Sequence, residues 1–521
     1  MRQLSRHDAS FLYADTVHAN ANVTFVQIYD PSTAPGGAVR FKSILAHIQG
    51  RLHQSPIFRS KLLRVPFELD EPYWVEDEYF DLEYHVRHIA LPKPGDWRQF
   101  CIQASRIHAR ALDLNRPLWE IYVIEGLDSI TDLPPGSFAL LTKIHHAAID
   151  VESRNEFIEL LHDRSPRPPK AQPPQPWFPE SAPGPLALLS RAALHRAFSP
   201  LKWMEPLTRT LPKALTFARD VLHPEHHLSA TRFHAVVSPH RVFDTRRFLV
   251  AEFEAIRALV PGATVDDAVL AVCAGGLRSY LARQAELPEA DLTAQVPEQA
   301  PGATQGTRHI QLGTSIADPV QRLAWIHAQT AAPAPTAGTA AARNLAPPCC
   351  TVTAVSSPDG PVYLHGAHMT YFSAILPISD GMGLVFAVSR YDERIVISPT
   401  SCRELVPDPE VFTQGVRDCF QDLLALARHD PSLAASAGAA AAAAAPPKPK
   451  PKPKPTPART SRSRPAAPPA APTGAQKTVR SAGARASAAG TPAPSARQAR
   501  SAAKPPAAAP DGRRRSTAPS D

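Results

Sequence analysis

The sequence predicts a mixed α/β protein with two globular halves and a disordered C-terminal tail. Strand-like and helix-like apolar patterns alternate along the chain up to residue 427. A proline-dense segment at 164–185 interrupts these patterns, because proline lacks a backbone donor and disfavours helix. The part of the chain before the tail is long enough for two domains of roughly 200 residues each.

The first half, residues 1–163, should contain both helices and strands. Residues 41–52 place apolar side chains at helical spacing. Residues 138–144, FALLTKI, are typical of a mostly buried strand. A helix is expected to follow at 151–161, VESRNEFIELL, and Asp150 can cap its N-terminus.

Residues 164–232 are predicted to form a linker followed by a basic helical segment. In that segment, residues 186–221, Leu, Ala and Phe alternate with Arg and Lys, and three prolines interrupt the pattern. Basic amphipathic helices can lie on anionic membranes, but packing between domains is their commoner use.

The second half, residues 233–431, opens with a strand-like stretch, HAVVSPHRVFDT, at 234–245. A helix pattern, RRFLVAEFEAIRALV, follows at 246–260. Small residues at 333–348 interrupt the pattern before a further strand, CCTVTAV, is expected at 349–355.

The tail, residues 432–521, differs from the rest of the chain in composition and charge. It is largely Ala, Pro, Lys, Arg, Ser and Thr without any aromatic residue, so it cannot bury enough apolar surface to fold. It carries 16 basic and 2 acidic residues, which leaves 40 basic and 46 acidic residues in the body. The net charge of +8 therefore arises in the tail, and the acidic body gives no reason to expect a nucleic-acid groove.

Several classes of protein find no support in the sequence. The six cysteines show no C-x-x-C spacing, which favours free thiols in a reducing compartment. No apolar run reaches the roughly 18 residues of a membrane span, so we expect a cytosolic protein that can at most lie on a membrane. The histidines of HPEHH, at 223–227, have no well-placed partner ligands, and no metal site is predicted. Neither a G-x-S-x-G elbow nor a phosphate-binding loop is present.

The segment KIHHAAID, at 143–150, carries the clearest chemistry. Successive side chains of a strand point to opposite faces, so His145 and His146 cannot both face one pocket. A neutral imidazole can accept the proton of an alcohol that attacks an acyl carbonyl. We predict that His146 is this base and that Asp150 holds the turn after the strand.

The histidine pair belongs to a series of motifs in a fixed order. These are LSRHDASFLYAD at 4–15, HVRHIALPKPGD at 85–96, Pro117-Leu118-Trp119, H-H-x-x-x-D at 145–150, GATVDDAVLAVCAGGLRSYL at 262–281 and IADPVQRLAWIH at 316–327. Together they resemble the bacterial wax ester synthase/diacylglycerol acyltransferase family over nearly all of residues 1–426.

The resemblance implies a fold, a reaction and a set of site residues. Two chloramphenicol-acetyltransferase-like domains are expected, with the active site at their interface. The implied reaction moves a fatty acyl group from long-chain acyl-CoA, a co-substrate, to diacylglycerol or a fatty alcohol, without a metal or other cofactor. His146 matches the catalytic base, with His145 supporting the strand end and Asp150 the turn. Pro117, Leu118 and Trp119 are expected to be structural.

Three motifs depart from the family pattern. Val151 replaces the glycine after the motif aspartate, Asp266-Asp267 replaces Asn-Asp, and Ala354 to Ser357 replace Asn-Val-Pro-Gly. We therefore expect Val151, Asp266 and Asp267 to influence substrate binding. Two hypotheses follow: either the acceptor specificity has shifted, or the protein is a weakly active or inactive paralogue that binds lipid or acyl-CoA.

The basic tail leaves a further alternative open. Its Lys-Pro repeats and Arg clusters could contact nucleic-acid phosphates, or they could tether the protein to an anionic membrane or lipid-body surface.

Overall fold

The computed structural model describes residues 1–149, 156–168, 177–197, 231–298, 306–332 and 347–429. All of them belong to one compact unit, Met1–Pro446. The predicted disorder of the tail lies outside the described residues, as does most of the basic segment, from residue 198 onward.

A six-stranded sheet forms the centre of the first half. Its order is β13-β14-β2-β7-β6-β5, and the β5–β6 pair alone is parallel. The strands are β2 (Asn22–Asp30), β5 (Val86–Ala90), β6 (Trp119–Glu125), β7 (Phe138–His145), β13 (Tyr363–Leu364) and β14 (Ala367–Ile375). A separate three-stranded sheet contains β1 (Arg2–Gln3), β4 (Tyr73–Glu76) and β3 (Ser60–Leu63).

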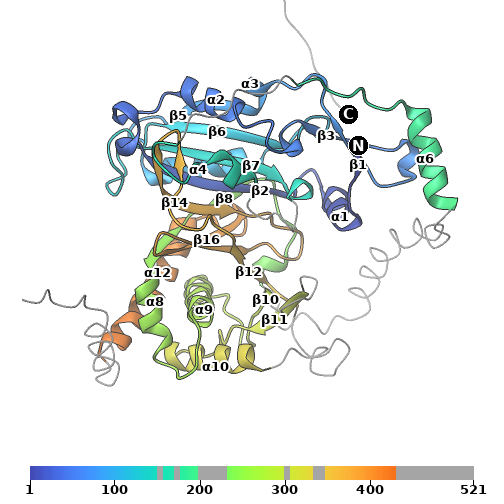
Figure 1. Cartoon of the computed structure of the whole chain (residues 1–521). Coiled ribbons are helices and arrows are strands. Elements are labelled where there is room, and N and C mark those ends of the chain that lie inside the picture. Colours follow the sequence, from blue (N-terminus) through green and yellow to red (C-terminus); the bar gives the residue numbers. More distant parts are fainter. Residues whose placement is uncertain (150–155, 169–176, 198–230, 299–305, 333–346, 430–521) are drawn as a thin grey trace, which may run out of the picture. The chain divides into compact units, whose positions relative to one another are not determined.

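The six-stranded sheet joins segments from both halves of the sequence. Strand β14 pairs with β2 from His368 opposite Asp30 to Ile375 opposite Thr24. The second half of the chain therefore supplies an inner strand, with β13 beside it, to the sheet of the first half. Figure 1 shows this exchange as the orange β14 beside the blue β2.

A seven-stranded sheet forms the centre of the second half. Its order is β11-β10-β12-β15-β16-β8, and β9 also pairs with β16. The strands are β8 (Arg241–Phe243), β9 (Arg246–Leu249), β10 (Thr293–Glu298), β11 (Gly306–Gln311), β12 (Cys350–Val355), β15 (Val385–Tyr391) and β16 (Arg394–Cys402).

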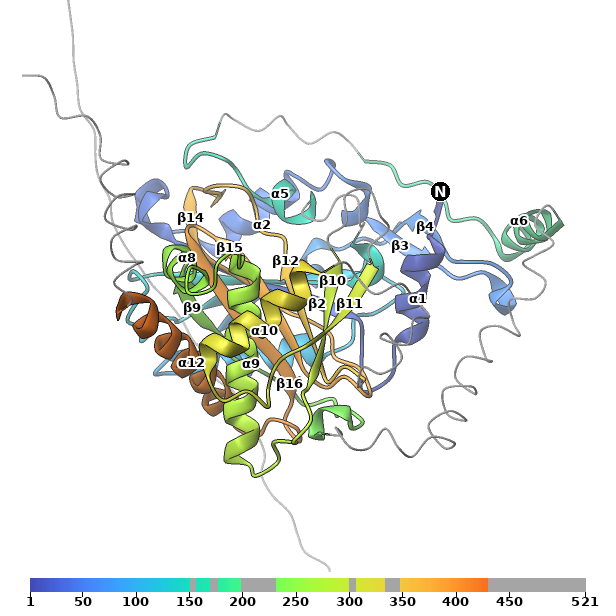
Figure 2. The same ribbon diagram turned by 90° about the horizontal axis from the view of Figure 1, so that it is seen from below.

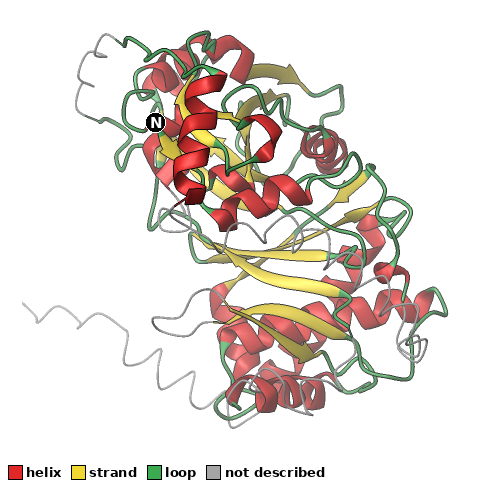
Figure 3. Cartoon of the chain, turned by 90° about the vertical axis from the view of Figure 1, so that its right-hand side faces the viewer, coloured by secondary structure: helices red, strands yellow, loops and turns green. Residues whose placement is uncertain are grey.

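Helices cover both sheets. The helices of the first half are α1 (Arg6–Ala14), α2 (Phe41–Gln49), α3 (Leu82–His85), α4 (Trp97–Ala109), α5 (Glu156–Leu161) and α6 (Pro185–Ala197). Those of the second half are α8 (Val250–Arg257), α9 (Val265–Arg283), α10 (Pro319–Ala331) and α12 (Pro409–His429). Helices α9 and α10 lie in front of the second sheet when the molecule is seen from below (Figure 2). Figure 3 shows the two sheets in yellow, with helices on their outer sides.

Two apolar clusters cover the opposite faces of the first sheet. Helices α2 and α5 share one cluster with Leu140 and Ile144 of β7. Helix α4 shares the other with Leu141, and this cluster includes Val396 from the second half. The core is thus continuous between the halves.

Asp244 adds a polar connection to this apolar one. Its buried carboxylate accepts hydrogen bonds from Trp97 Nε1 of α4, at 2.9 Å, and from Arg246 Nη1, at 2.8 Å. It also accepts one from the Thr413 hydroxyl of α12. A single carboxylate thereby joins a helix of the first half to a helix of the second.

The mixed α/β prediction is confirmed, but two of the expected elements differ. The predicted strand at 138–144 corresponds to β7, and the helix at 41–52 to α2. The helix expected at 246–260 is wrong at its start, because Arg246–Leu249 pair with β16 as a strand before α8 begins. The strand-like stretch at 234–245 forms only the short β8. Pairing with a distant strand decides both cases, and local pattern cannot show such pairing. Among the described residues, no helix is both long and apolar enough to span a bilayer.

Candidate active site

The two histidines lie where β7 ends. The His145 amide donates a hydrogen bond to the Leu118 carbonyl, just before β6, at 3.0 Å. The His146 amide donates to the carbonyl of Ala21, just before β2, at 2.8 Å. The neighbouring chain segments on both sides therefore fix the backbone of the pair, and a short 3₁₀ turn, His146–Ala148, follows.

Both ring nitrogens of His145 are used inside the fold. Its Nδ1 accepts a hydrogen bond from the Ala147 amide at 3.1 Å, and its Nε2 lies 3.0 Å from Asp15 Oδ2. A backbone N–H can only donate, so Nδ1 must carry a lone pair and the ring proton lies on Nε2. His145 is 1% exposed and has no nitrogen free to react with a substrate.

His146 has a different environment. Its ring stacks on Phe11 of α1, with centroids 3.8 Å apart and planes at 20°. Its Nδ1 is buried, without a hydrogen-bond partner of regular geometry among the described residues. Burial lowers the pKa of His146 below the ordinary value of 6.5; positive charge on His145 or His7 acts in the same direction, and the residue's own carbonyl and Asp8 oppose it. The ring is therefore neutral at pH 7, and Nε2 is the atom available as a base.

Helix α1 is held so that Phe11 meets His146. Ser5 caps the helix by accepting a hydrogen bond from the Asp8 amide at 3.1 Å, and its hydroxyl donates to the Asp8 carboxylate at 2.6 Å. His7 packs edge-on against Phe11, with ring centroids 5.2 Å apart. The motif that begins with Leu4 thus caps a helix and places an aromatic ring on the candidate base. The motif at 4–15 contains Ser5, Asp8 and Phe11, but the sequence pattern alone does not indicate these roles.

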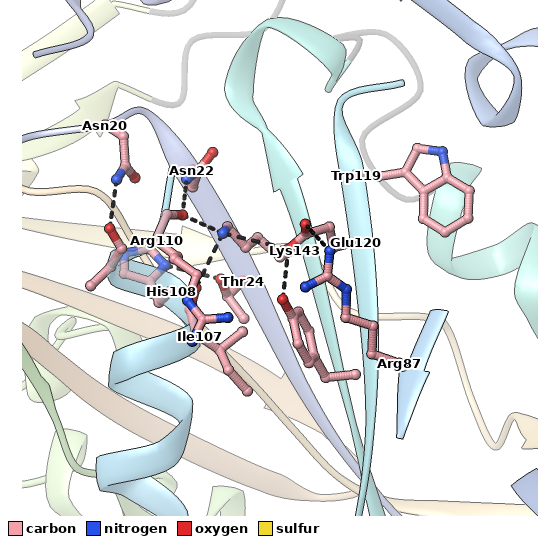
Figure 4. Close-up of polar contacts among 12 residues, drawn as sticks. Asn20, Asn22, Thr24, Arg87, Ile107, His108, Arg110, Trp119, Glu120 and Lys143 are labelled. Carbon is pink, nitrogen blue, oxygen red and sulfur yellow. Dashed lines mark hydrogen bonds and ion pairs between the residues drawn. The ribbon is translucent and has the colours of Figure 1, made fainter. Parts of the chain in front are cut away.

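A buried cation lies on β7, two residues before the pair. Lys143 Nζ donates to the Ile107 carbonyl at 3.1 Å and to the Arg110 carbonyl, and it lies 3.8 Å from Glu120 Oε2 (Figure 4). Burial lowers the pKa of Lys143 from 10.5 to about 8, although Glu120 favours the charged form. The ammonium is thus still charged at pH 7, at the negative end of the α4 dipole.

Two asparagines also donate hydrogen bonds to the carbonyls at this end of α4. Asn20 Nδ2 donates to the Ala109 carbonyl at 3.0 Å, and Asn22 Nδ2 donates to the Arg110 carbonyl at 3.2 Å. Figure 4 shows both side chains pointing at the same helix end as Lys143. The last carbonyls of a helix have no partner within it, and here the chain around β2 and β7 supplies the donors. No local sequence pattern indicates this capping arrangement.

The Pro-Leu-Trp segment lies in the core beside the pair. Trp119 is 1% exposed, its Nε1 donates to the Phe58 carbonyl at 3.1 Å, and its ring stacks on His85. Pro117 and Leu118 are buried as well, and Leu118 supplies the carbonyl that holds His145.

The acidic pair of the second half lies at the start of α9. Asp267 is buried, and its carboxylate accepts hydrogen bonds from the Thr264 amide at 2.8 Å, His327 Nδ1 at 3.0 Å and the Thr330 hydroxyl at 2.6 Å. Burial opposes its ionisation, but these hydrogen bonds leave the pKa of Asp267 below its usual value. Both of its oxygens are thus used within the fold. The pKa of Asp266 is raised by desolvation and by Asp267, with Arg390 acting against the shift.

The other predicted positions differ in how much the structure describes. Asp150 and Val151 lie outside the described residues. Ala354 is next to last in β12, and Val355 packs against the apolar cluster that contains Ala147. The second half therefore contributes to the apolar cluster to which the turn after β7 also belongs. No cluster of potential ligands suited to a metal ion occurs among the residues that the structure describes.

A cleft of about 950 Å³ lies away from the histidines. Its lining includes Ile28, near the far end of β2, together with Trp97, Phe248 and Tyr371. None of its lining residues belongs to α1 or to the turn after β7. We therefore do not assign this cleft to the chemistry of His146.

Comparison with known proteins gives matches along most of the chain. A model of the wax ester synthase/diacylglycerol acyltransferase catalytic domain matches residues 4–269, and one of the C-terminal domain of the same family matches residues 328–424. The chain is 32% identical over 344 residues to a Mycobacterium tuberculosis protein named as a diacylglycerol O-acyltransferase. This match covers 63% of this chain and 71% of the relative. A second protein of that name and organism is 29% identical over 475 residues, covering 83% and 92%.

A solved structure supports the same fold. The wax ester synthase/diacylglycerol acyltransferase from Marinobacter aquaeolei VT8 is 24% identical, with a TM-score of 0.60, over 82% of this chain and 99% of that one. The predicted two-domain fold is thereby confirmed.

Removal of the ring that covers His146 should change its titration. In Phe11→Ala, the imidazole gains solvent, so we expect its pKa to rise toward 6.5. The midpoint can be measured by NMR titration of the His146 ring. Phe11→Leu is the matched control, since it keeps apolar cover and should shift the midpoint less. Equal midpoints in Phe11→Ala and the native protein would show that Phe11 does not cause the shift.

Loss of the buried ammonium should destabilise the fold. Lys143→Met leaves the last α4 carbonyls without their charged donor and removes one partner of Glu120, which keeps Arg87 and Tyr122. The loss is expected to cost about 3 kcal/mol in unfolding free energy. Arg257→Met is the control, because Arg257 pairs with Glu254 on the surface and its loss should cost at most about 1 kcal/mol. Thermal unfolding compares the two. Equal stability of both variants would contradict the role given to Lys143.

Proposed function

The chain belongs to the wax ester synthase/diacylglycerol acyltransferase family, and we propose that it transfers a fatty acyl group from acyl-CoA to the hydroxyl of diacylglycerol or a long-chain alcohol. The observation that carries this proposal is the state of His146. It is a neutral imidazole with a buried Nδ1, placed by backbone hydrogen bonds at the end of β7.

The proposed reaction needs one proton acceptor. Nε2 of His146 takes the hydroxyl proton of the acceptor while the oxygen attacks the thioester carbonyl carbon. The tetrahedral intermediate then collapses, the C–S bond breaks, and the imidazolium returns the proton to the departing CoA sulfur. One O–H and one C–S bond are lost, one C–O and one S–H bond are formed, and the histidine ends as it began.

The surroundings of His146 suit this role. A base must be neutral before it can accept a proton, and the lowered pKa keeps it so at pH 7. His145 supports the same turn but does not compete for the proton, because both of its nitrogens are engaged. We further propose that Asp150 holds the turn after the histidine pair, and that Val151 and Asp266 influence which acceptor is used.

An ester-forming assay tests the proposal. Purified protein incubated with palmitoyl-CoA and either dipalmitoylglycerol or hexadecanol should give triacylglycerol or wax ester. His146→Ala should lower the rate by roughly 10²- to 10⁴-fold, the usual contribution of a general base. His53→Ala, at an exposed histidine in the turn after α2, is the matched control and should keep the native rate.

Two outcomes would contradict the proposal. Equal rates in His146→Ala and the native protein would remove His146 from the chemistry. Binding of acyl-CoA by the native protein without any ester would indicate the catalytically silent paralogue instead.

We also propose that the basic tail brings the enzyme to anionic lipid surfaces. Its 16 basic residues can attract the protein to anionic lipid surfaces, where water-insoluble acceptors are found. Deletion of residues 434–521 should therefore release the protein from phosphatidylserine vesicles in a flotation assay. Neutral phosphatidylcholine vesicles are the control. Unchanged binding of the truncated chain to anionic vesicles would refute the tether.

A further inference from the structure

We infer that Asp15 is a positioning residue for this site: its carboxylate fixes the tautomer of His145 and, through Ala21, the backbone of His146. The inference about the reaction rate rests on the proposed function, whereas the inference about the tautomer does not. Asp15 follows directly after α1, whose Phe11 covers His146.

The Asp15 carboxylate receives two donors from different parts of the site. Oδ1 accepts a hydrogen bond from the Ala21 amide at 2.7 Å, and Oδ2 accepts one from His145 Nε2 at 3.0 Å. Ala21 in turn accepts the amide hydrogen of His146 through its carbonyl, at 2.8 Å. One carboxylate thus contacts one histidine directly and the other through a single residue.

The segment that follows Asp15 is anchored to both halves of the chain. On the first half, Asn20 and Asn22 donate to the carbonyls at the end of α4. On the second half, Arg241 Nη2 donates to the His18 carbonyl at 2.7 Å, and His18 Nε2 lies 3.1 Å from Asp380 Oδ2. Ala21 therefore lies in a segment with fixed ends, and the Asp15 carboxylate meets it in a set geometry.

The hydrogen-bond pattern requires a carboxylate at position 15. Both of its partners are donors, because the Ala21 amide always donates and His145 must carry its proton on Nε2 while Nδ1 accepts from Ala147. An asparagine has only one acceptor oxygen. If that oxygen faces Ala21, its amide hydrogens face the proton on His145 Nε2; if it faces His145, they face the Ala21 amide. Either arrangement places two hydrogen-bond donors face to face.

Through its contact with Ala147, the tautomer of His145 affects the turn that contains His146. A proton moved to Nδ1 of His145 would oppose the Ala147 amide, which is the second residue of the 3₁₀ turn that begins with His146. His146 would lose its position while keeping its chemical identity. Misplacement of a catalytic group by about 1 Å can lower a rate by roughly 10²-fold. We therefore expect Asp15 to influence kcat much more than the KM for acyl-CoA.

The direct test measures the ring proton of His145 in the full chain. ¹⁵N NMR of histidine-labelled protein should show the proton on Nε2 in the native protein. In Asp15→Asn, we expect it to move to Nδ1 or to be shared between the two nitrogens, and kcat for ester formation to fall by about 10- to 100-fold. Asp15→Glu restores a carboxylate and should recover the native tautomer and part of the rate.

The matched control is Asp30→Asn at the other end of β2. Asp30 caps a short turn by accepting a hydrogen bond from the Ser32 amide at 2.8 Å, without contact to either histidine of the pair. This variant should keep the native tautomer and rate.

Several outcomes would overturn the inference. A proton on Nδ1 of His145 in the native protein would do so whatever the variants show. A folded Asp15→Asn with native tautomer and kcat would do so as well. If Asp15→Asn did not fold, the native tautomer and the tautomer of Asp15→Glu would decide, and a native protein that forms no ester would contradict only the proposed function.

Discussion

The candidate site depends on a buried ammonium at the end of α4. Lys143 holds the last carbonyls of this helix against β7, two residues before the histidine pair, and Glu120 balances its charge. A buried charge is unfavourable unless its partners are in place. Here they come from one helix and one strand, so the ion pair forms only when α4 and the first sheet are correctly packed. The same packing places the loop before β2 beside the histidines.

The two histidines have different roles although they are neighbours in sequence. His145 gives one nitrogen to Ala147 and the other to Asp15, and so its ring is part of the framework. His146 has a buried Nδ1, and the apolar surface of Phe11 covers its ring. Burial acts differently on the two rings. It strengthens the hydrogen bonds of His145, because they lie away from water. It lowers the pKa of His146, so that this ring is neutral and able to accept a proton.

Sequence reasoning could predict the elements that depend on local pattern. The apolar spacing of residues 138–144 and 41–52 predicts β7 and α2. Strand alternation predicts different directions for His145 and His146, but β7 ends at His145, and His146 is held in the turn that follows by the hydrogen bond of its amide to Ala21. Contacts between distant segments could not be predicted. The entry of β14 beside β2 and the contact of Asp15 with His145 join residues more than 100 positions apart, and no local signal marks either one. Asp267 could be identified as a family position, but its use as a helix cap became visible only in three dimensions.

The role of His146 as the general base can be tested by two titrations of the same protein. The midpoint of the His146 ring can be measured by NMR, and the acid limb of the pH profile of kcat/KM reports the essential base of the free enzyme. If His146 Nε2 is that base, the two midpoints coincide and both lie below the ordinary histidine value of 6.5. An acid limb that does not follow the His146 titration would contradict the assignment of His146 as the general base.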